Sequence, residues 1–192
     1  MSNVGTWMQR TAQDWLVLQL TAYSGAAIGI TTGLQFLPFL LMSPFAGVVA
    51  DRIPKHRLLQ LTNLGMAFPA VVLGLLAVTG TAQIWHVYVL AFVLGVASAF
   101  DAPARQSFVS EIVDKDDLTN AVGLNSASFN AARIVGPAIA GVLIAALGGG
   151  AVATGWVILL NAVSYAAPIL TLRTLDEAAL RTPALVRREP GQ

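Results

Sequence analysis

The sequence has 192 residues, of which 56% are hydrophobic and only 11% are charged, and its formal net charge is +1. Because an ordinary soluble domain is about one quarter charged, this composition excludes a soluble monomer and predicts a membrane protein with the lipid bilayer as its partner. The small net charge gives no indication of a nucleic-acid partner, and the absence of cysteine excludes disulfides and thiolate metal sites.

Long apolar tracts follow one another along the chain. No Asp, Glu, Lys or Arg occurs at 15–50, 58–100, 118–132 or 134–172. The longer tracts exceed the roughly 20 residues with which a helix spans a bilayer, and their continuous apolar sequence disfavours the alternating strands of a β-barrel. The predicted fold class is therefore an all-α membrane protein, a bundle of six transmembrane helices. Glycine, proline and charge place the predicted spans at 3–22, 26–49, 58–80, 84–104, 119–147 and 152–172.

Basic residues occupy alternate connections between the predicted spans. They occur between the second and third spans, between the fourth and fifth, and in residues 173–192, whereas the connections around Ser24, Thr81 and Gly149 hold none. Positively charged connections remain in the cytoplasm. We therefore expect a multi-pass protein of the cell membrane with both termini in the cytoplasm. The N-terminus lacks the basic region and the cleavage site of a signal peptide.

The first predicted span carries polar side chains on one helical face. Arg10, Gln13 and Asp14 cluster there with Thr6. Arg10 and Asp14 would lie near the middle of the bilayer, where charged side chains face the interior of a bundle or a water-filled cavity. We interpret the group as cavity residues that bind substrate or protons, and the alternative is an internal salt bridge with a structural role.

The junction between the second and third spans concentrates charge in the stretch GVVADRIPKHR, which begins at Gly47. Its charged residues are Asp51, Arg52, Lys55 and Arg57. Any basic connection would fix the orientation of the chain. Gly47, however, also allows close helix packing, and Asp51 places at the membrane edge an acidic group that is costly unless it is paired. This spacing favours a gating role over a purely orienting one.

The same stretch resembles the signature loop between helices two and three of the major facilitator superfamily, with Pro54 where that family usually has glycine. The resemblance implies that Asp51 contacts the other half of the transporter when the protein faces outward. We expect Lys55 to hold a carboxylate, for which Asp101 is a candidate.

The fourth predicted span ends in FDAPARQSF, where Asp101 and Arg105 lie four residues apart on one helical face. The pair is either a weak interfacial pair or part of the gate, and Pro103 predicts a kink or a helix end beside it. Many proton-driven drug antiporters of the superfamily carry an arginine in this helix, four residues before a glycine. If that glycine is Gly95, the arginine position holds Ala91, so this arginine gives no support for proton coupling.

Two faces of the fifth predicted span carry different side chains. Ser126, Asn130 and Arg133 share a polar face that we expect to line the cavity, with Arg133 and Asp14 as candidate partners. A second stripe holds small residues that permit close contact with a neighbouring helix. It consists of Ala132, Gly136 and Ala140.

This span also resembles the helix-five motif of the superfamily, with alanine in place of glycine at two positions. The matching residues are Gly123, Ala132, Gly136, Pro137, Ala140 and Gly141. The resemblance implies that the stripe of small residues packs across the interface between two halves of a transporter.

Over residues 1–172 the chain resembles the efflux branch of the superfamily that includes the bacterial enterobactin exporter. The resemblance implies a twelve-helix transporter in which 1–172 form the N-terminal six-helix half and 173–192 a cytoplasmic tail or the start of a central loop. It also implies a C-terminal six-helix half as partner. The expected function is secondary active efflux of a small molecule, a drug or a siderophore, by alternating access driven by an ion gradient, which in this family is a proton gradient.

Rival functions lack their sequence signatures. An intramembrane serine protease needs a Ser in a G-x-S-x-G context and a metalloprotease an H-E-x-x-H motif, and neither pattern occurs. The six-helix domain of an ATP-driven exporter would lack the loop motif between the second and third spans. A structural or assembly role, including that of a non-functional fragment, remains as an alternative. No phosphate-binding loop, dinucleotide motif or cluster of metal ligands is present, so we predict no enzyme activity and no cofactor.

Overall fold

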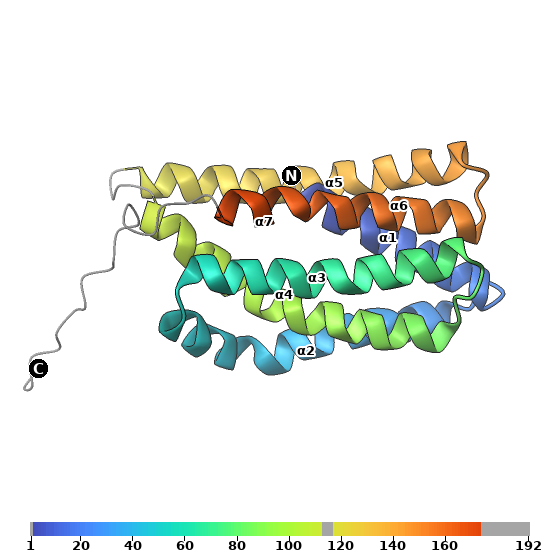
Figure 1. The fold of residues 1–192 in the computed structure, drawn as a ribbon, viewed down its shortest axis with the longest axis horizontal. Coiled ribbons are helices and arrows are strands. Elements are labelled where there is room, and N and C mark those ends of the chain that lie inside the picture. Colours follow the sequence, from blue (N-terminus) through green and yellow to red (C-terminus); the bar gives the residue numbers. More distant parts are fainter. Residues whose placement is uncertain (1, 113–116, 174–192) are drawn as a thin grey trace, which may run out of the picture.

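The computed structural model describes residues 2–112 and 117–173, and within these ranges the chain is helical with short connections (Figure 1). No strand occurs in these ranges, which confirms the predicted all-α class. The helices are α1 (Ser2–Leu20), α2 (Gly25–Arg52), α3 (Lys55–Val78), α4 (Ile84–Ile112), α5 (Leu118–Ala146), α6 (Ala151–Ser164) and α7 (Ala166–Arg173).

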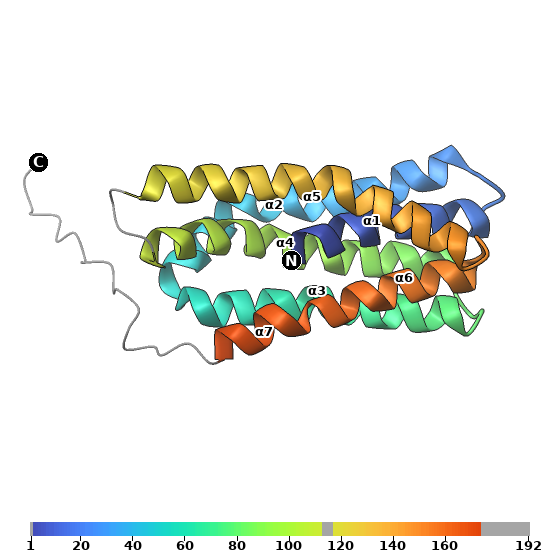
Figure 2. The ribbon, with the colours of Figure 1, turned by 90° about the horizontal axis from the view of Figure 1, so that it is seen from above.

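The helices run side by side along the long axis of one bundle. Seen from above, α2 and α5 lie along one edge and α3 and α6 along the other, with α1 and α4 between them (Figure 2). The connections α1–α2, α3–α4 and α5–α6 lie at one end of the bundle, and the α2–α3 junction lies at the opposite end (Figure 1). This arrangement encloses α1 and α4 most deeply and leaves α2 and α5 at an open edge.

The described ranges contain five stretches that are long and apolar enough to cross a membrane. They are Gly25–Ala50, Lys55–Val78, Ile84–Phe108, Leu118–Ala146 and Ala151–Thr171. The first predicted span, which forms α1, falls short in apolar character because it carries several polar side chains. The bundle encloses two of them, Gln9 and Gln13, which are each 1% exposed. Burial among other helices, rather than contact with lipid, therefore accommodates the polar residues of α1.

The charged stretch between the second and third predicted spans is mostly helical. The prediction ended one span at 49 and began the next at 58, but α2 continues to Arg52 and α3 begins at Lys55. Only Ile53 and Pro54 connect them, and Ile53 is extended, as expected for a residue before proline. Arg52 lies in the last turn of α2, where a positive charge is favourable because helix dipoles are negative at that end.

Two prolines act differently from each other. Pro103 does not end the fourth span, as the sequence analysis allowed, because α4 runs through it to Ile112. Pro168, by contrast, follows the break at Tyr165 that divides the sixth predicted span into α6 and α7. Proline has no N–H to donate to the carbonyl group four residues earlier, which here belongs to Ser164, and its ring crowds that carbonyl. The interruption of the sixth span therefore has a local cause.

Glycines allow the closest helix contacts. A Cβ atom at Gly95 of α4 would overlap the backbone carbonyl oxygen of Gln35 in α2. In the α3–α6 contact, a Cβ at Gly155 would lie 2.8 Å from the backbone nitrogen of Val78, and one at Gly74 would lie 2.6 Å from a carbon of the Leu159 side chain. Backbones approach this closely only where no side chain intervenes.

The α5–α6 turn needs glycine for a conformational reason. Gly148 and Gly149 have φ angles of 97° and 74°, in the region that side chains disfavour. The turn is fixed to α1, because the Trp15 indole N–H and the Gln19 amide donate to the Gly149 carbonyl oxygen at 3.0 Å and 2.5 Å. The predicted break at this triplet of glycines is confirmed.

Alanine at Gly148 is expected to lower the free energy of unfolding by about 1–2 kcal/mol, the cost of a left-handed conformation for a residue with a Cβ. Space is not limiting there, because a Cβ would meet no atom within 4 Å. The measurement is the thermal unfolding midpoint, in detergent, of the purified full-length protein, by which we mean the complete product of the gene. Gly150→Ala serves as the control, since that glycine of the same turn has an ordinary φ of −83° and is equally open. Equal midpoints for the two variants would contradict the left-handed conformation at Gly148.

Candidate functional site

A cavity of about 580 Å³ opens between α1, α2, α4 and α5. Polar and aromatic side chains line it together, which is typical of sites for small organic molecules. Its polar lining residues are Asn3, Thr6, Arg10, Gln35, Ser98, Asp101, Arg105, Gln106, Asn125, Ser126, Asn130 and Arg133, and its aromatic ones are Trp7, Phe36, Phe39 and Phe129. The volume matches that of a drug-sized ligand site.

The cavity brings together most of the residues that the sequence analysis assigned to it. Arg10 of α1 and the polar face of α5, formed by Ser126, Asn130 and Arg133, all line it. Gln13 and Asp14 do not belong to the lining: Gln13 is buried and Asp14 half-buried. Gln13 lies 60° round the helix from Arg10 at 100° per residue, and Asp14 lies on nearly the same face as Arg10 but one turn further along α1.

The Trp7 ring contacts several other side chains that line the cavity. The Arg10 guanidinium lies 4.9 Å from the centroid of the Trp7 ring and 5.1 Å from that of Phe36. The Arg133 guanidinium, which comes from α5, lies 5.6 Å from the same Trp7 centroid. Phe129 meets the Trp7 ring edge-on at 5.8 Å. Both cations therefore share one aromatic platform, an arrangement that attracts guanidinium groups through the ring quadrupole.

Arg133 and Asp14, the candidate partners of the sequence analysis, do not pair. The structure shows no ion pair between these two described residues, and the Arg133 side chain lies against Trp7 instead. Asp14 lies one turn beyond Arg10 on α1, outside the cavity lining. The prediction rested on similar depth in the membrane, and depth does not determine which side chains on different helices meet.

Asp101 of α4, which also lines the cavity, makes a compact polar group. Arg105 donates to one carboxylate oxygen from Nε at 3.2 Å and from Nη2 at 2.8 Å, and the Thr62 hydroxyl donates to the other at 3.0 Å. This confirms the predicted pairing of Asp101 with Arg105. Among the described residues the carboxylate of Asp101 contacts Arg105 and Thr62, and no ion pair joins it to Lys55, so the carboxylate partner of Lys55 stays a prediction.

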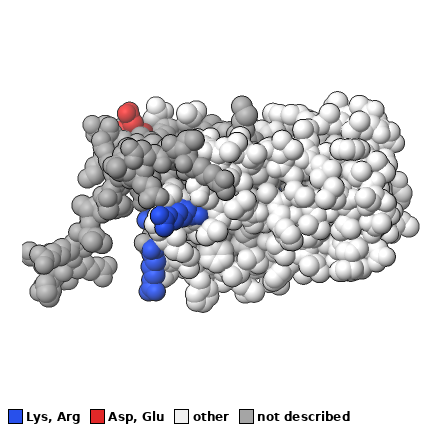
Figure 3. Space-filling model, viewed as in Figure 1, with Lys and Arg blue, Asp and Glu red and all other residues white. Residues whose placement is uncertain are grey.

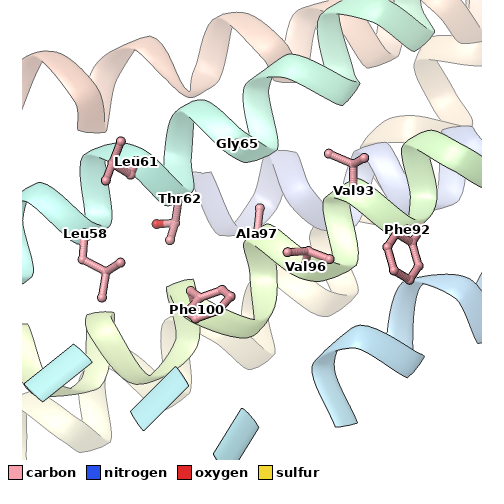
Figure 4. A pocket seen from close by; sticks show the side chains of 9 residues that line it. All are labelled: Leu58, Leu61, Thr62, Gly65, Phe92, Val93, Val96, Ala97 and Phe100. Carbon is pink, nitrogen blue, oxygen red and sulfur yellow. The ribbon is translucent and has the colours of Figure 1, made fainter. Parts of the chain in front are cut away.

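A smaller hollow of about 370 Å³ lies between α3 and α4 (Figure 4). Its lining is apolar apart from Thr62, as the side chains of Leu58, Val96 and Phe100 illustrate. Because the Thr62 hydroxyl is already bound to Asp101, the hollow offers a ligand no free polar group among the described residues. Within the described ranges no three His, Cys, Asp or Glu side chains are grouped so that they could hold a metal ion.

Comparison with known proteins decides the family. Residues 1–188 match the model of a family described as transmembrane secretion effector. The chain belongs to this family of major facilitator transporters.

Several curated relatives of this transporter family resemble the chain. It is 34% identical to the staphyloferrin A transporter of Staphylococcus aureus over 74% of the chain and 36% of that protein. It is 30% identical to the multidrug efflux pump Tap of Mycolicibacterium fortuitum over 91% of the chain and 42% of the pump. It is 27% identical to the macrolide efflux protein A of Streptococcus pyogenes over 67% of the chain and 32% of that protein. The chain thus spans less than half the length of these relatives.

The helix-five motif of this major facilitator chain packs inside the described bundle. The stripe of small residues formed by Ala132, Gly136 and Ala140 is buried, and a Cβ at Gly136 would lie 2.7 Å from the Trp7 Cβ and 2.8 Å from the Val4 carbonyl oxygen. The stripe therefore contacts α1, not a second half as the resemblance implied. The other motif glycines, Gly123 and Gly141, are exposed and meet no atom within 4 Å. Pro137 lies inside α5 without ending it.

The charged junction of the major facilitator motif lies at the end of the bundle. The Lys and Arg side chains visible in Figure 3 gather where α2 meets α3. Arg52 and Arg57 are exposed and Lys55 is half-buried. The side chain of Asp51, the predicted latch, lies outside the described part of the structure. The expectation of a close helix contact at Gly47 is not met among the described residues, because a Cβ there would meet no atom within 4 Å.

A buried polar network between α1 and α6 escaped the sequence analysis. The Asn161 side-chain amide donates to Oε1 of Gln9, and the Ser164 hydroxyl donates to Oδ1 of Asn161 at 2.9 Å. The Thr6 and Tyr165 hydroxyls lie 3.1 Å apart. Asn161 could have indicated this network, because an amide inside an apolar span needs a polar partner. The network fixes the helix that presents Trp7 and Arg10.

Proposed function

We propose that this chain forms the N-terminal half of a secondary active transporter that exports a small organic molecule. Residues 1–172 would form the six-helix half, and residues 173–192 would form a cytoplasmic tail or the start of a central loop. The observation that carries the proposal is the cavity between α1, α2, α4 and α5, which places arginines and aromatic side chains within a membrane-spanning bundle. The names of the relatives, which export drugs or carry a siderophore, support efflux.

The proposed second half would cover α2 and α5. These helices form one edge of the bundle (Figure 2). In the most apolar stretch of each helix, only 22% of the residues are buried. Large side chains on this edge are exposed, among them Leu40, Phe45, Leu124 and Ile134, which are between 69% and 75% exposed. A second six-helix half packed there would close the cavity on its open side.

The proposed orientation follows from charge. The basic side chains of the α2–α3 connection lie at one end of the bundle, whereas the connections at the other end hold none (Figures 1 and 3). By the positive-inside rule the basic end lies in the cytoplasm and the protein resides in the cell membrane. Both termini would then face the cytoplasmic side, although α1 begins part-way along the bundle and runs away from the basic end (Figure 1).

An ion gradient would supply the energy for the proposed transport. The sequence lacks a phosphate-binding loop, and Ala91 occupies the position of the arginine found in many proton-coupled relatives of the superfamily. Asp14 and Asp101 are the carboxylates within the described bundle that would carry a proton. The transporter proposal is preferred to an intramembrane enzyme because the chain lacks the protease signatures and the cavity holds no histidine among its described lining residues.

Transport by membrane vesicles tests the proposal. Everted vesicles that contain the full-length protein would be offered a carboxylate siderophore, a macrolide and a cationic dye while a proton gradient is imposed. We expect at least one of these compounds to accumulate in the vesicles, and a protonophore to abolish the accumulation. No accumulation of any of them, although the protein is correctly inserted, would contradict the proposal.

Asp51→Asn tests the proposed cytoplasmic latch in the same vesicles. If Asp51 grips the second half in the outward-facing state, the variant is expected to insert normally but to lose most of its transport, because an amide keeps the shape of the side chain and removes its charge. Asp117→Asn is the control, since it makes the same change at an exposed residue between α4 and α5 that lies outside the proposed latch. Undiminished transport in Asp51→Asn with normal insertion would refute the latch.

A further inference from the structure

The described lining of the cavity carries an excess of positive charge. Its charged members are Arg10, Arg105, Arg133 and Asp101, and the single aspartate is held by Arg105. Arg10 and Arg133 form no hydrogen-bonded ion pair with any described carboxylate, and both lie against the ring of Trp7. Two cations on one wall of a cavity within the bilayer are unfavourable unless water or an anion faces them.

Two residues of the cavity lining carry hydrogen-bond donors that have no acceptor. Arg10 Nε is buried and has no hydrogen-bond partner, and the same holds for Gln35 Nε2, which comes from α2. Both residues line the cavity. A buried donor without an acceptor costs about 1–3 kcal/mol. Both atoms lie behind the cavity surface, so a ligand oxygen would bind them favourably once the Arg10 and Gln35 side chains turn toward it.

Aromatic rings lie around these donors. The ring centroid of Phe36 lies 5.1 Å from the Arg10 guanidinium, and the ring centroid of Phe129 lies 5.8 Å from that of Trp7. Both phenylalanines line the cavity. Planar apolar groups stack well against such rings, and a guanidinium stacked on an aromatic face keeps its edge N–H groups available for a carboxylate. The wall therefore combines anion-binding donors with an aromatic surface.

We propose that the cavity selects organic anions, specifically carboxylates that carry a planar apolar or aromatic group. The carboxylate binds Arg10 and Arg133, and the planar group lies against Phe36 and Phe129. This inference rests on the proposed export function and specifies its substrate class.

Binding of two matched probes tests the charge preference without transport. 2-Naphthoate and 2-naphthylmethylammonium share a ring system and differ in the sign of their charge. Titration calorimetry would use the full-length protein in nanodiscs of zwitterionic lipid, so that the lipid surface attracts neither probe. We expect saturable binding of 2-naphthoate and none of the ammonium compound. Equal or tighter binding of the ammonium compound, or no binding of 2-naphthoate, would overturn the inference.

Three variants locate the binding. Arg10→Gln and Arg133→Gln are each expected to weaken 2-naphthoate binding about tenfold, the effect of losing one charge-assisted hydrogen bond. Trp156→Ala, exposed and outside the cavity lining, should bind normally. Arg133 is also exposed, so its substitution does not threaten the core, and Arg133→Lys should restore part of the affinity. Unchanged binding in both glutamine variants would show that the anion binds elsewhere and would overturn the inference.

The outcome separates this inference from the export function. Vesicles that export a cationic dye, with no 2-naphthoate binding in nanodiscs, would refute the anion preference and leave export standing. Binding of 2-naphthoate that depends on Arg10 and Arg133, with no export of any offered compound, would support the anion site and refute export.

Discussion

Gly95→Ala is expected to destabilise the full-length protein by about 3 kcal/mol, the upper part of the range for overpacking. A Cβ at this position would overlap the carbonyl oxygen of Gln35 and lie 3.0 Å from its carbonyl carbon. Both atoms belong to the backbone of α2, so no side chain can move aside, and the helices would have to separate. Because Gln35 lines the cavity, the same displacement would widen the site. Thermal unfolding in detergent measures the first effect and 2-naphthoate titration the second.

Gly33→Ala is the matched control for this prediction. Gly33 lies in α2 close to Gln35, but a Cβ there would meet no atom within 4 Å. Alanine is favoured over glycine inside a helix by about 0.5–1 kcal/mol, so this variant should be as stable as the original protein or slightly more stable. If Gly95→Ala and Gly33→Ala unfold at the same temperature, the close α2–α4 contact is not present in the protein.

Trp7→Ala is expected to reduce transport about tenfold or more at low substrate concentration. Trp7 holds the guanidinium groups of Arg10 and Arg133, and each cation–π contact is worth about 0.5–2 kcal/mol, depending on its exposure to water. Without the ring, both arginines would lose their fixed positions, and the Michaelis constant would rise more than the maximal rate falls. Initial rates in everted vesicles over a range of substrate concentrations would separate the two.

Trp7→Ala leaves the α1–α5 contact in place. The atom of Trp7 that a Cβ at Gly136 would meet is its Cβ, which alanine retains. Trp7→Phe keeps an aromatic face and should preserve most of the transport. Trp156→Ala is the control for loss of an indole, because Trp156 of α6 is 52% exposed and does not line the cavity. Equal transport by Trp7→Ala and Trp156→Ala would show that the platform has no role.

The fold could be predicted from the sequence because charge-free tracts and glycine-rich turns are local signals. Each of the six predicted spans is helical, and the φ angles of Gly80, Gly148 and Gly149 explain why two of the predicted breaks occur. The helix ends were less predictable. Charge at 51–57 suggested a loop, but charged side chains at a helix terminus can remain helical while their ends reach water.

The cavity was predictable only in part. Arg10 and the polar face of α5 were identified because charged or polar groups inside a membrane face a bundle interior. The pairing of Arg133 with Trp7 was missed, since helical periodicity shows which residues share a face but not which helix lies opposite. For the same reason the stripe at Gly136 was assigned to a second half, whereas the structure packs it against α1.

Cysteine accessibility tests most directly the central claim, that the cavity is a water-filled path within the membrane. The chain contains no cysteine, so single cysteines can be introduced into it cleanly. Asn130→Cys lies on the exposed cavity face of α5, and Val163→Cys occupies an apolar position of α6 that is 70% exposed. A thiol reacts as its thiolate, which forms in water and is suppressed in apolar surroundings. In membranes that contain the full-length protein, a charged methanethiosulfonate is predicted to modify Asn130→Cys and to leave Val163→Cys unmodified; equal reactivity at the two positions, or an unreactive Asn130→Cys, would contradict the account.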